Sequence, residues 1–399
     1  MVEHKKVLLA HPDIAPPGGV QGLAAYVLQA LQGEYDISIA CYRPPAYNTL
    51  NRYFGTALQA ENFTLYQVPN WMTWLLEHQP TPQALLKSCV LEAFIKRLAR
   101  RQHFDIYFST INELSFPKRG IQYIHFPRTY PARPDVDYRW FHRLPGALKL
   151  YRTCCYWIAG MAWADLRRNL TLANSNYIAS IFEGYHNVKP RIVFPPAPGH
   201  FTVKPWAEKK DQIVCLGRIA TDKDLPKVIE IIRQLRVLGH DLSLIVIGTW
   251  DCSGAYRRNL RRLLEQHRDW VRLEQDIPRQ KVVRLLEESR YGIHGMVGEH
   301  FGMAVAEMQQ AGCIVFVPHI GGPVEIVGHE PRVIYASVEE AVTKIDAVLR
   351  DSGLQTELYH HALRQRELFT TERFVREIQE IVRQFGHASS TGPDVSSPV

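Results

Sequence analysis

Short apolar runs alternate with amphipathic stretches along the first half of the chain. Each run has the length of a buried strand, and the runs lie at residues 7–10, 37–40, 63–68, 104–109, 122–124, 170–173 and 191–194. Between them, apolar residues recur every three or four positions, as in helices that pack by one face, most clearly over 83–101, 147–168 and 177–184. Strands that alternate with helices in this way predict a parallel, doubly wound sheet.

A proline-rich stretch separates this pattern from a second one like it. Residues 195–205 hold four prolines and a glycine, a composition typical of a linker. The second pattern predicts strands at 213–217, 242–248, 271–273, 291–294, 314–317 and 333–335, separated by helices at 223–238, 255–268, 279–289, 302–311 and 338–350. We therefore predict an α/β protein with two Rossmann-like, doubly wound domains, at residues 1–198 and 199–370.

The end of the chain differs from both domains. Residues 371–386 form one more amphipathic pattern, which predicts a helix that packs back on the first domain. From 387 to 399, Ser, Thr, Gly and Pro dominate, and we expect a disordered tail.

Composition places the chain among soluble globular proteins. It has 399 residues, of which 46% are hydrophobic and 22% charged. Apolar runs stay shorter than the roughly 18–20 residues that cross a bilayer, and the first residues lead into a strand without a secretory signal. The seven cysteines form no C-x-x-C pair. We therefore expect reduced thiols and a cytoplasmic protein.

The positive charge is concentrated in the first domain. Residues 1–198 hold 21 Lys and Arg against 13 Asp and Glu, a balance of +8, whereas the whole chain carries only +7. An excess of this kind indicates an anionic partner, such as a nucleic acid, a membrane surface or a phosphorylated acceptor.

Residues 295–328 carry the most distinctive chemistry. Glycines at 295, 298 and 302 let the backbone approach a ligand closely, and the helix predicted to begin near 302 directs free N–H groups at that turn. Glu299 precedes this helix, and Glu307 lies about a turn and a half inside it. Two carboxylates can thus flank a ligand that has both hydroxyl and phosphate groups. The alternative is an ordinary α/β turn with two surface glutamates.

Three further residues follow predicted strands. Arg218 and Lys223 come after the first strand of the second domain, where a forked donor and a point cation suit a diphosphate. Solvated charges in a helix-start loop are the alternative. His125 follows a strand of the first domain and precedes the cationic Arg128. A core histidine that only makes hydrogen bonds is the alternative there.

Together these residues resemble glycosyltransferase family 4, the retaining enzymes with the GT-B fold. The resemblance spans about residues 5–385 and rests on residues 17–20, on Gly217-Arg218 with Lys223, on the Glu299/Glu307 pair around Phe301-Gly302, and on residues 321–327. Within the family, residues 123–127, 173–175, 192–196 and 299–302 are most similar to the α-1,2-mannosyltransferases that elongate dolichol-diphosphate-linked oligosaccharides. The resemblance implies two Rossmann-like domains that face a central cleft.

The resemblance also implies a role for each position. Glu307 would hold the ribose hydroxyls of the donor, while Arg218 and Lys223 would neutralise its diphosphate. Glu299 and His125 would lie against the donor sugar as catalytic residues. The remaining donor contacts would come from Gly18, Gly19, His300, Phe301, Gly302, Met303 and Ala304.

The chain departs from the family at three points. Gln21 stands where many members have a glutamate, and Asp224 stands where a glycine usually follows the lysine. The transmembrane anchor of the most similar mannosyltransferases is also missing from the pattern. Asp135-Val136-Asp137 matches the D-x-D metal motif of a different glycosyltransferase fold, but it sits among prolines in the wrong topology. We expect no metal and no cofactor.

The leading hypothesis is transfer of a hexose from a nucleotide diphosphate sugar, with mannose from GDP-mannose as the first guess, to a hydroxyl of a lipid-linked, glycan or small-molecule acceptor. Preorganised cations would stabilise the departing diphosphate without a metal. A glycosidase using Glu299 and Glu307 is an alternative that leaves Arg218 and Lys223 without a role. An epimerase of GT-B shape and a non-catalytic protein that binds membrane or nucleic acid are two others. Since every donor-site residue is present, we expect no nucleic-acid partner.

The acceptor side is predicted from charge. The pattern at 83–101 is apolar and ends in four cations, and residues 140–163 mix basic with aromatic side chains. Such segments suit peripheral contact with the anionic inner face of a membrane, and Arg128 and Arg133 would then bind a lipid-linked or phosphorylated acceptor. In the opposing interpretation, both helices bury their apolar faces in the domain core, and the cations complement helix dipoles.

Overall fold

The computed structural model describes residues 4–15, 18–78, 84–131 and 146–391 of the chain. Contacts divide it into two compact units, each described here by itself. Unit 1 comprises Met1–Asn174, Ile178–Val193 and Phe374–Val399, and unit 2 comprises Ser175–Tyr177 and Phe194–Arg373. The break at Val193/Phe194 precedes the predicted boundary of 198/199 by a few residues.

Unit 1 is built on a parallel sheet of seven described strands in the order β3-β2-β1-β4-β5-β6-β7. The strands are β1 (Lys6–Ala10), β2 (Asp36–Cys41), β3 (Phe63–Gln67), β4 (Ile106–Ser109), β5 (Ile121–Ile124), β6 (Leu170–Ala173) and β7 (Arg191–Ile192). The order of strands reverses between β1 and β4. In a doubly wound sheet, ligands bind at the carboxyl ends of the strands that flank such a switch point.

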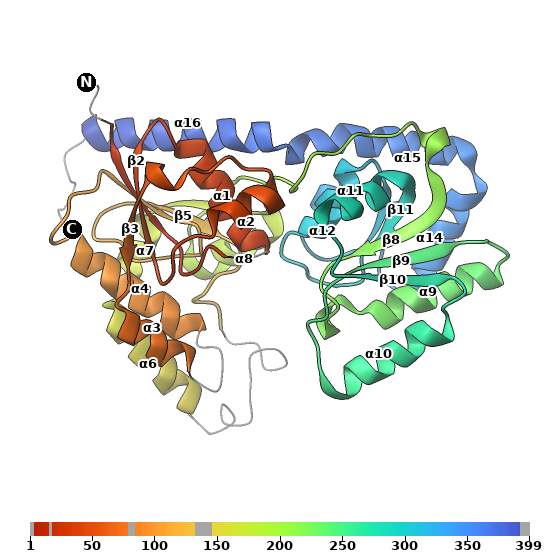
Figure 1. The fold of residues 1–399 in the computed structure, drawn as a ribbon, viewed down its shortest axis with the longest axis horizontal. Helices are drawn as coiled ribbons and strands as arrows, with labels where there is room; N and C mark the ends of the chain where they lie inside the picture. Colours follow the sequence, from red (N-terminus) through yellow and green to blue (C-terminus); the bar gives the residue numbers. More distant parts are fainter. Residues whose placement is uncertain (1–3, 16–17, 79–83, 132–145, 392–399) are drawn as a thin grey trace. The chain divides into compact units, whose positions relative to one another are not determined.

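Helices cover both faces of this sheet (Figure 1). Strand residues alternate: Val7 and Leu9 belong to the core on one face, and Leu8 and Ala10 to the core on the other. The first core includes α1 (Gly19–Leu31), α2 (Tyr47–Phe54) and α16 (Thr371–Thr391), and the second includes α3 (Asn70–Glu77) and α4 (Ala84–Leu98). The remaining described helices of this region are η1 (Ala60–Asn62), α6 (Ala147–Ala159), α7 (Trp163–Arg168) and α8 (Asn176–His186).

The C-terminal helix α16 belongs to unit 1 from Phe374 onward. Its side chains from Phe374 to Phe385 enter the core beside α1, and Gln379 Nε2 donates to the carbonyl of Ala30 at 2.9 Å. The helix continues to Thr391. The predicted disordered tail begins at 387, inside the described end of this helix, and residues 392–399 lie outside the described residues.

Unit 2 contains a parallel sheet of six described strands in the order β10-β9-β8-β11-β12-β13. The strands are β8 (Lys210–Leu216), β9 (Ser243–Gly248), β10 (Val271–Gln275), β11 (Ser289–Ile293), β12 (Ile314–Pro318) and β13 (Ile334–Tyr335). The helices are η3 (Trp206–Glu208), η4 (Thr221–Lys223), α9 (Leu225–Val237), α10 (Gly254–Gln266), α11 (Arg279–Glu288), α12 (Met303–Gln310), α13 (Pro323–Ile326), α14 (Val338–Arg350), α15 (Ser352–Gln365) and η5 (Arg366–Phe369). The switch point lies between β8 and β11.

Every predicted strand is present, although several ends shift by one to three residues. The predicted helix 147–168 is interrupted at Gly160, whose φ of +55° ends α6 before α7 begins at Trp163. Helices α2, α3, α13 and α15 were not predicted. That the two units face a common cleft stays a prediction.

Candidate functional site

Lys223 and Glu299 meet at the switch point of unit 2. Lys223 ends η4, in the loop that follows β8, and Glu299 lies in the loop that follows the neighbouring strand β11. Their side chains form an ion pair, and both are less than one-fifth exposed. Lys223 Nζ also lies 3.4 Å from the sulfur of Met296. Two of the predicted site residues are thus brought together at the carboxyl edge where ligands of this fold bind.

Glycines bring the loops of this edge into contact. A Cβ on Gly295 would lie 2.5 Å from the carbonyl oxygen of Lys223, so only glycine lets the β11 loop approach η4 this closely. Gly321 has a φ of +120°, and its Cβ would lie 2.5 Å from the carbonyl oxygen of Glu299. The backbone of Gly322 donates to that same carbonyl at 2.9 Å. The glycine pair at 321–322 therefore positions the Glu299 loop through backbone contact.

The charge state of Glu299 is set by two neighbours. Burial raises its pKa, but the contact with the His294 ring and the charge of Lys223 outweigh burial, so the pKa lies well below its usual range. His294 Nε2 is 3.5 Å from the carboxylate, at the outer limit of a hydrogen bond. Burial lowers the pKa of His294, and this histidine is therefore neutral at pH 7. Glu299 is an ionised acceptor, able to hold sugar hydroxyls.

Glu307 occupies the second turn of α12, where its side chain is buried. Its partner is Arg279, the first residue of α11, whose guanidinium forms an ion pair with it and also donates to the carbonyl of Pro198. Burial raises the pKa of Glu307, and the charge of Arg279 opposes that rise. The arginine therefore orients the carboxylate that we expect to accept ribose hydroxyls.

Arg218 turns away from Glu299. It forms ion pairs with Asp251, in the loop after β9, and with Asp222 at 3.5 Å, and its side chain is more than half exposed. Since β9 and β11 flank β8 on opposite sides, Arg218 and Lys223 reach toward opposite neighbours of the strand they follow. Both cations are held by carboxylates, which an incoming diphosphate must displace or share.

The start of α12 lies between the two glutamates in sequence. Gly302 caps it with a φ of +102°, and a Cβ there would lie 2.9 Å from Pro323. His300 precedes the cap, and Met303 and Ala304 form the first helical turn, whose amide N–H groups have no partner within the helix. The buried ring of Phe301 stacks with Phe194 at 6.3 Å and fixes this turn on the core. Such a turn can bind an anion.

The structure explains why Asp224 can stand where a glycine usually follows the lysine. Asp224 follows Lys223 with φ +46° and ψ +49°, a left-handed conformation that glycine adopts readily and aspartate tolerates. The substitution therefore preserves the backbone path that a glycine would take here.

In unit 1, the predicted residues follow β1 and β5. Gly18 is extended and caps α1, which begins at Gly19, and the side-chain amide of Gln21 folds back against Gly18. His125 Nε2 lies 3.1 Å from the carbonyl oxygen of Thr110, so this nitrogen carries a proton and donates it to the carbonyl. Because Thr110 directly follows β4, His125 leans toward the switch point of unit 1.

Arg128 does not serve as a surface ligand, contrary to the prediction. Its side chain is only 6% exposed and forms an ion pair with Glu92 at 2.5 Å. It also donates to the Ser88 hydroxyl at 2.9 Å. The guanidinium therefore holds its loop on α4, and Arg128 is not available to an acceptor. Arg133 and the Asp135–Asp137 motif lie outside the described residues.

Sequence reasoning missed three residues at this site. Arg279 pairs with Glu307, His294 contacts Glu299, and Asp251 holds Arg218. None belongs to a recognisable motif. Arg279 and Asp251 lie 28 and 33 residues from their partners along the chain, whereas His294 lies only five residues before Glu299. The position of His294 at the end of a predicted strand was the one available signal.

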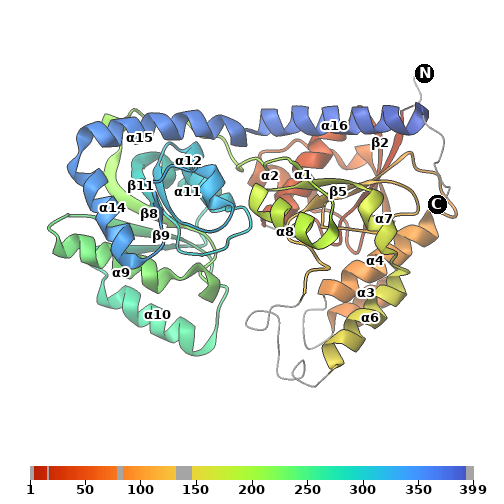
Figure 2. The same cartoon turned by 180° about the vertical axis from the view of Figure 1, so that it is seen from behind.

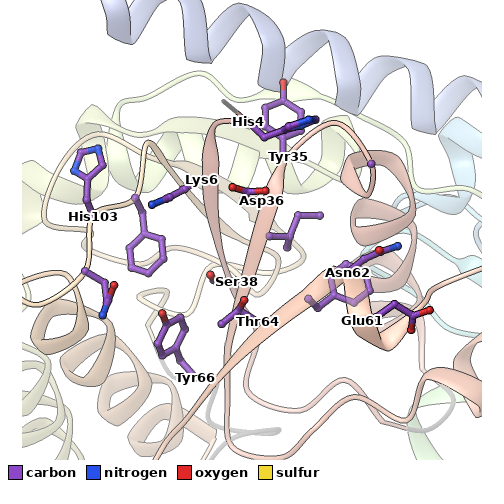
Figure 3. Close-up of a pocket in the computed structure, with 15 residues that line it drawn as sticks. His4, Lys6, Tyr35, Asp36, Ser38, Glu61, Asn62, Thr64, Tyr66 and His103 are labelled. Carbon is purple, nitrogen blue, oxygen red and sulfur yellow. The ribbon is translucent and has the colours of Figure 1, made fainter. Parts of the chain in front are cut away.

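A polar cavity of about 570 Å³ lies elsewhere, at the amino ends of β1, β2 and β3 (Figure 3). Lys6, Asp36, Tyr66 and His103 are among its lining residues. It opens at the edge of the unit 1 sheet opposite to the carboxyl ends of the strands. This cavity is separate from the residues discussed above.

The described residues form neither a metal-binding cluster nor a membrane-spanning helix. No three His, Cys, Asp or Glu side chains within them gather as a metal ion requires. No helix among them combines the length and the apolar character needed to cross a membrane.

Comparison with known proteins supports the fold and relates unit 2 to a known family. Residues 199–365 match the family described as glycosyl transferases group 1. Similar solved structures include WaaG, a glycosyltransferase involved in lipopolysaccharide biosynthesis, with a TM-score of 0.64 at 15% identity over 94% of this chain and 99% of that chain. A sucrose-phosphate synthase from Thermosynechococcus elongatus gives a TM-score of 0.68 at 14% identity over 96% and 100%. The chain has the GT-B fold of such glycosyltransferases.

The curated relatives align with a smaller part of this chain than these solved structures do. The enzyme named GDP-Man:Man(3)GlcNAc(2)-PP-Dol alpha-1,2-mannosyltransferase is 29% identical in Mus musculus over 37% of this chain and 32% of the relative. In Dictyostelium discoideum the enzyme of that name is 26% identical over 56% and 48%. The chain therefore spans less than half the length of these relatives.

Proposed function

We propose that this protein, whose residues 199–365 match the family described as glycosyl transferases group 1, transfers a hexose from a nucleotide diphosphate sugar to an acceptor hydroxyl with retained anomeric configuration. The observation that carries the proposal is the Lys223–Glu299 pair at the switch point between β8 and β11. It places a cation for a phosphate next to an ionised carboxylate for sugar hydroxyls. Glu307, oriented by Arg279, supplies the acceptor for the ribose.

The reaction breaks the bond between the anomeric carbon and the diphosphate oxygen, and it forms a bond from that carbon to the acceptor oxygen. Lys223 and Arg218 neutralise the negative charge that grows on the leaving diphosphate, and the start of α12 adds backbone N–H donors. The acceptor hydroxyl attacks on the face that the diphosphate leaves, and its proton passes to a departing phosphate oxygen. His125 contacts the sugar as a hydrogen-bonding group. The mechanism requires no metal.

For the substrates, the curated relatives supply the first candidates. Their names specify GDP-mannose as donor and a dolichol-diphosphate-linked glycan as acceptor. We propose mannose from GDP-mannose as donor sugar and a lipid-linked or phosphorylated glycan as acceptor. The +8 balance of residues 1–198 supports an anionic acceptor.

Thermal unfolding with GDP, UDP, ADP and their hexose conjugates tests the donor site, because only a bound ligand raises the midpoint. Hydrolysis of each nucleotide sugar without acceptor then tests the reaction. We expect the diphosphate of one of these nucleosides to raise the midpoint of unfolding. The hexose conjugate of that nucleoside should slowly release its hexose, as the α-anomer if the donor sugar is α-linked. A chain that no nucleoside diphosphate stabilises would contradict the proposal, and release of an epimerised sugar would indicate an epimerase.

A further inference from the structure

Tryptophan is distributed unevenly between the units. In unit 2, Trp206, Trp250 and Trp270 are at least partly buried, and each lies under an arginine guanidinium 5.0–5.7 Å from its ring. In unit 1, the four described tryptophans are exposed: Trp71 by 68%, Trp74 by 60%, Trp157 by 82% and Trp163 by 40%. Large apolar rings that remain in water on one part of a molecule mark an interaction site.

Three of these tryptophans form stripes on two helices. On α3, Trp71 and Trp74 point outward, whereas Thr73 and Leu76 on the opposite side are buried. On α6, Leu150, Cys154, Trp157 and Ile158 are all exposed and recur at the spacing of one helical face. The opposite side of α6 carries the buried Cys155 and Ala159. Both helices are thus apolar on the side that the core does not use.

The helix α4 holds α3 and α6 in one substructure (Figures 1 and 2). Leu86 of α4 belongs to the cluster that includes α3 and also to the cluster that includes α6. Lys96 of α4 donates to the last carbonyls of α6, at 3.1 Å to Ala159 and 2.7 Å to Gly160. Arg152 of α6 donates to the carbonyl of Thr129 at 2.8 Å. The exposed stripes therefore sit on fixed helices.

The structure changes which segment can meet a membrane. The predicted amphipathic segment 83–101 forms α4, whose Val90, Leu91 and Ile95 are buried in the core of unit 1. The alternative of a core helix is therefore correct for this segment. The cation Lys96 at its end is engaged by α6, as described above. The exposed apolar residues lie on α3, which was not predicted, and on α6, which lies within the other predicted segment, 140–163.

We infer that the outward stripes of α3 and α6, defined by Trp71, Trp74, Leu150, Trp157 and Ile158, bind the interfacial region of a phospholipid bilayer. Tryptophan concentrates at the level of lipid headgroups because its ring is apolar and its N–H is polar. The exposed Lys149 flanks the α6 stripe, and the +8 balance of residues 1–198 attracts anionic lipids. Only the purpose of this surface rests on the proposed function: it would bring unit 1 to a lipid-linked acceptor.

Vesicle sedimentation of the full chain tests the surface without substrate or acceptor, so its outcome is independent of the transferase proposal. Vesicles of phosphatidylcholine alone and of phosphatidylcholine with phosphatidylglycerol are compared at low and high salt. We expect binding to both, stronger with phosphatidylglycerol at low salt. W157S, and separately W71S/W74S, should lower the partition coefficient about tenfold or more, as expected when large apolar side chains are withdrawn from the interface.

The matched control is V237S/L238S, which removes two exposed apolar residues of unit 2 and should bind as wild type does. An environment-sensitive dye on Cys154, the one exposed cysteine of the seven, should shift its emission to the blue when vesicles are added. Thermal unfolding of each variant checks that it is folded. Because the two stripes are varied separately, the inference can still be tested with one variant if the other misfolds. Equal binding of wild type and both tryptophan variants would overturn the inference. It would equally be overturned if the wild type formed a dimer that W157S dissociates and bound no vesicles.

Discussion

Lys223 and Glu299 form an ion pair although 76 residues separate them in the chain. The order of strands causes this contact, because β8 and β11 are neighbours in the sheet and the loops after them carry the two residues. The pair balances one positive against one negative charge, and the charge of Lys223 helps to keep Glu299 ionised. A bound diphosphate can take over the cation, and the carboxylate is then available to the hydroxyls of the sugar.

Removing either phosphate cation should weaken binding of the nucleoside diphosphate. Loss of a charge-assisted contact costs about 1.5–3 kcal/mol, or roughly 10- to 150-fold in Kd. We expect K223A to lose more than R218A, because Arg218 is more exposed and shared by two aspartates. Calorimetric titration measures both. Affinity unchanged in both variants would show that the cations serve only their carboxylate partners.

E307Q should weaken binding of the nucleotide with and without its sugar, because the ribose is common to both ligands. E299Q should instead weaken binding only when the sugar is present and should slow turnover. Titration with the diphosphate and with the nucleotide sugar separates the two roles. The reverse pattern would mean that the two carboxylates have exchanged functions.

R279A should destabilise unit 2, since it leaves the buried Glu307 without its cation. Breaking a buried ion pair costs about 3–5 kcal/mol. The exposed pair Arg268–Glu265 offers a matched control, and R268A should change stability by less than about 1 kcal/mol. Urea unfolding measures the two free energies. Equal midpoints for R279A and R268A would contradict the structural role of Arg279.

G321A tests the contact between the loops after β11 and β12. An added methyl group would meet the Glu299 carbonyl, at a backbone φ of +120° that disfavours alanine. Gly239 has φ +96° with open space around it, so G239A carries backbone strain without the contact. We expect G321A to lose about 1–3 kcal/mol more stability than G239A, together with a larger fall in activity. Similar losses in both variants would show that strain alone matters.

Stability should fall as pH drops below about 6.5, in part because of His11. Burial and the nearby His125 lower the pKa of the buried His11 to about 3. Between pH 6.5 and about 3, this histidine is therefore protonated in the unfolded state but not in the folded state. The free energy of unfolding consequently decreases as the pH falls. At about pH 5 the loss from this residue is about 2 kcal/mol.

H11N should flatten this pH dependence, because asparagine does not titrate and can still accept from the Asp13 amide. His103, whose side chain is three-quarters exposed, supplies the control variant H103N. Urea unfolding at several pH values gives the slopes. An H11N slope identical to that of wild type would assign the acid sensitivity to other groups.

Activity should survive EDTA, because in the proposed mechanism cationic side chains and helix N–H groups neutralise the diphosphate without a metal. Turnover is measured with purified protein before and after chelation. Complete loss that Mg²⁺ or Mn²⁺ restores would contradict the metal-independent proposal.

The periodicity of apolar residues determined the fold class. Runs such as 7–10 and 213–217 could be identified because strands buried on both faces read as continuous apolar segments. Helices α2, α3 and α15 escaped prediction, and α3 shows the reason. Its Trp71 and Trp74 are exposed while Leu76 is buried, so its apolar residues surround the helix and give no one-sided pattern.

The sequence by itself also indicated which loops place glycines and charged residues at the carboxyl ends of strands, as at Gly217-Arg218 and at 295–302. It could not determine the partners. Arg128 looked like a surface cation, yet the fold buries it against Glu92. Arg279 belongs to no motif and reaches Glu307 only because the fold brings the start of α11 to α12. Local patterns in the sequence reflect the periodicity of one helix or strand. Ion pairs and exposure depend on which distant elements become neighbours through the order of strands in the sheet. Only the tertiary structure decides which elements those are.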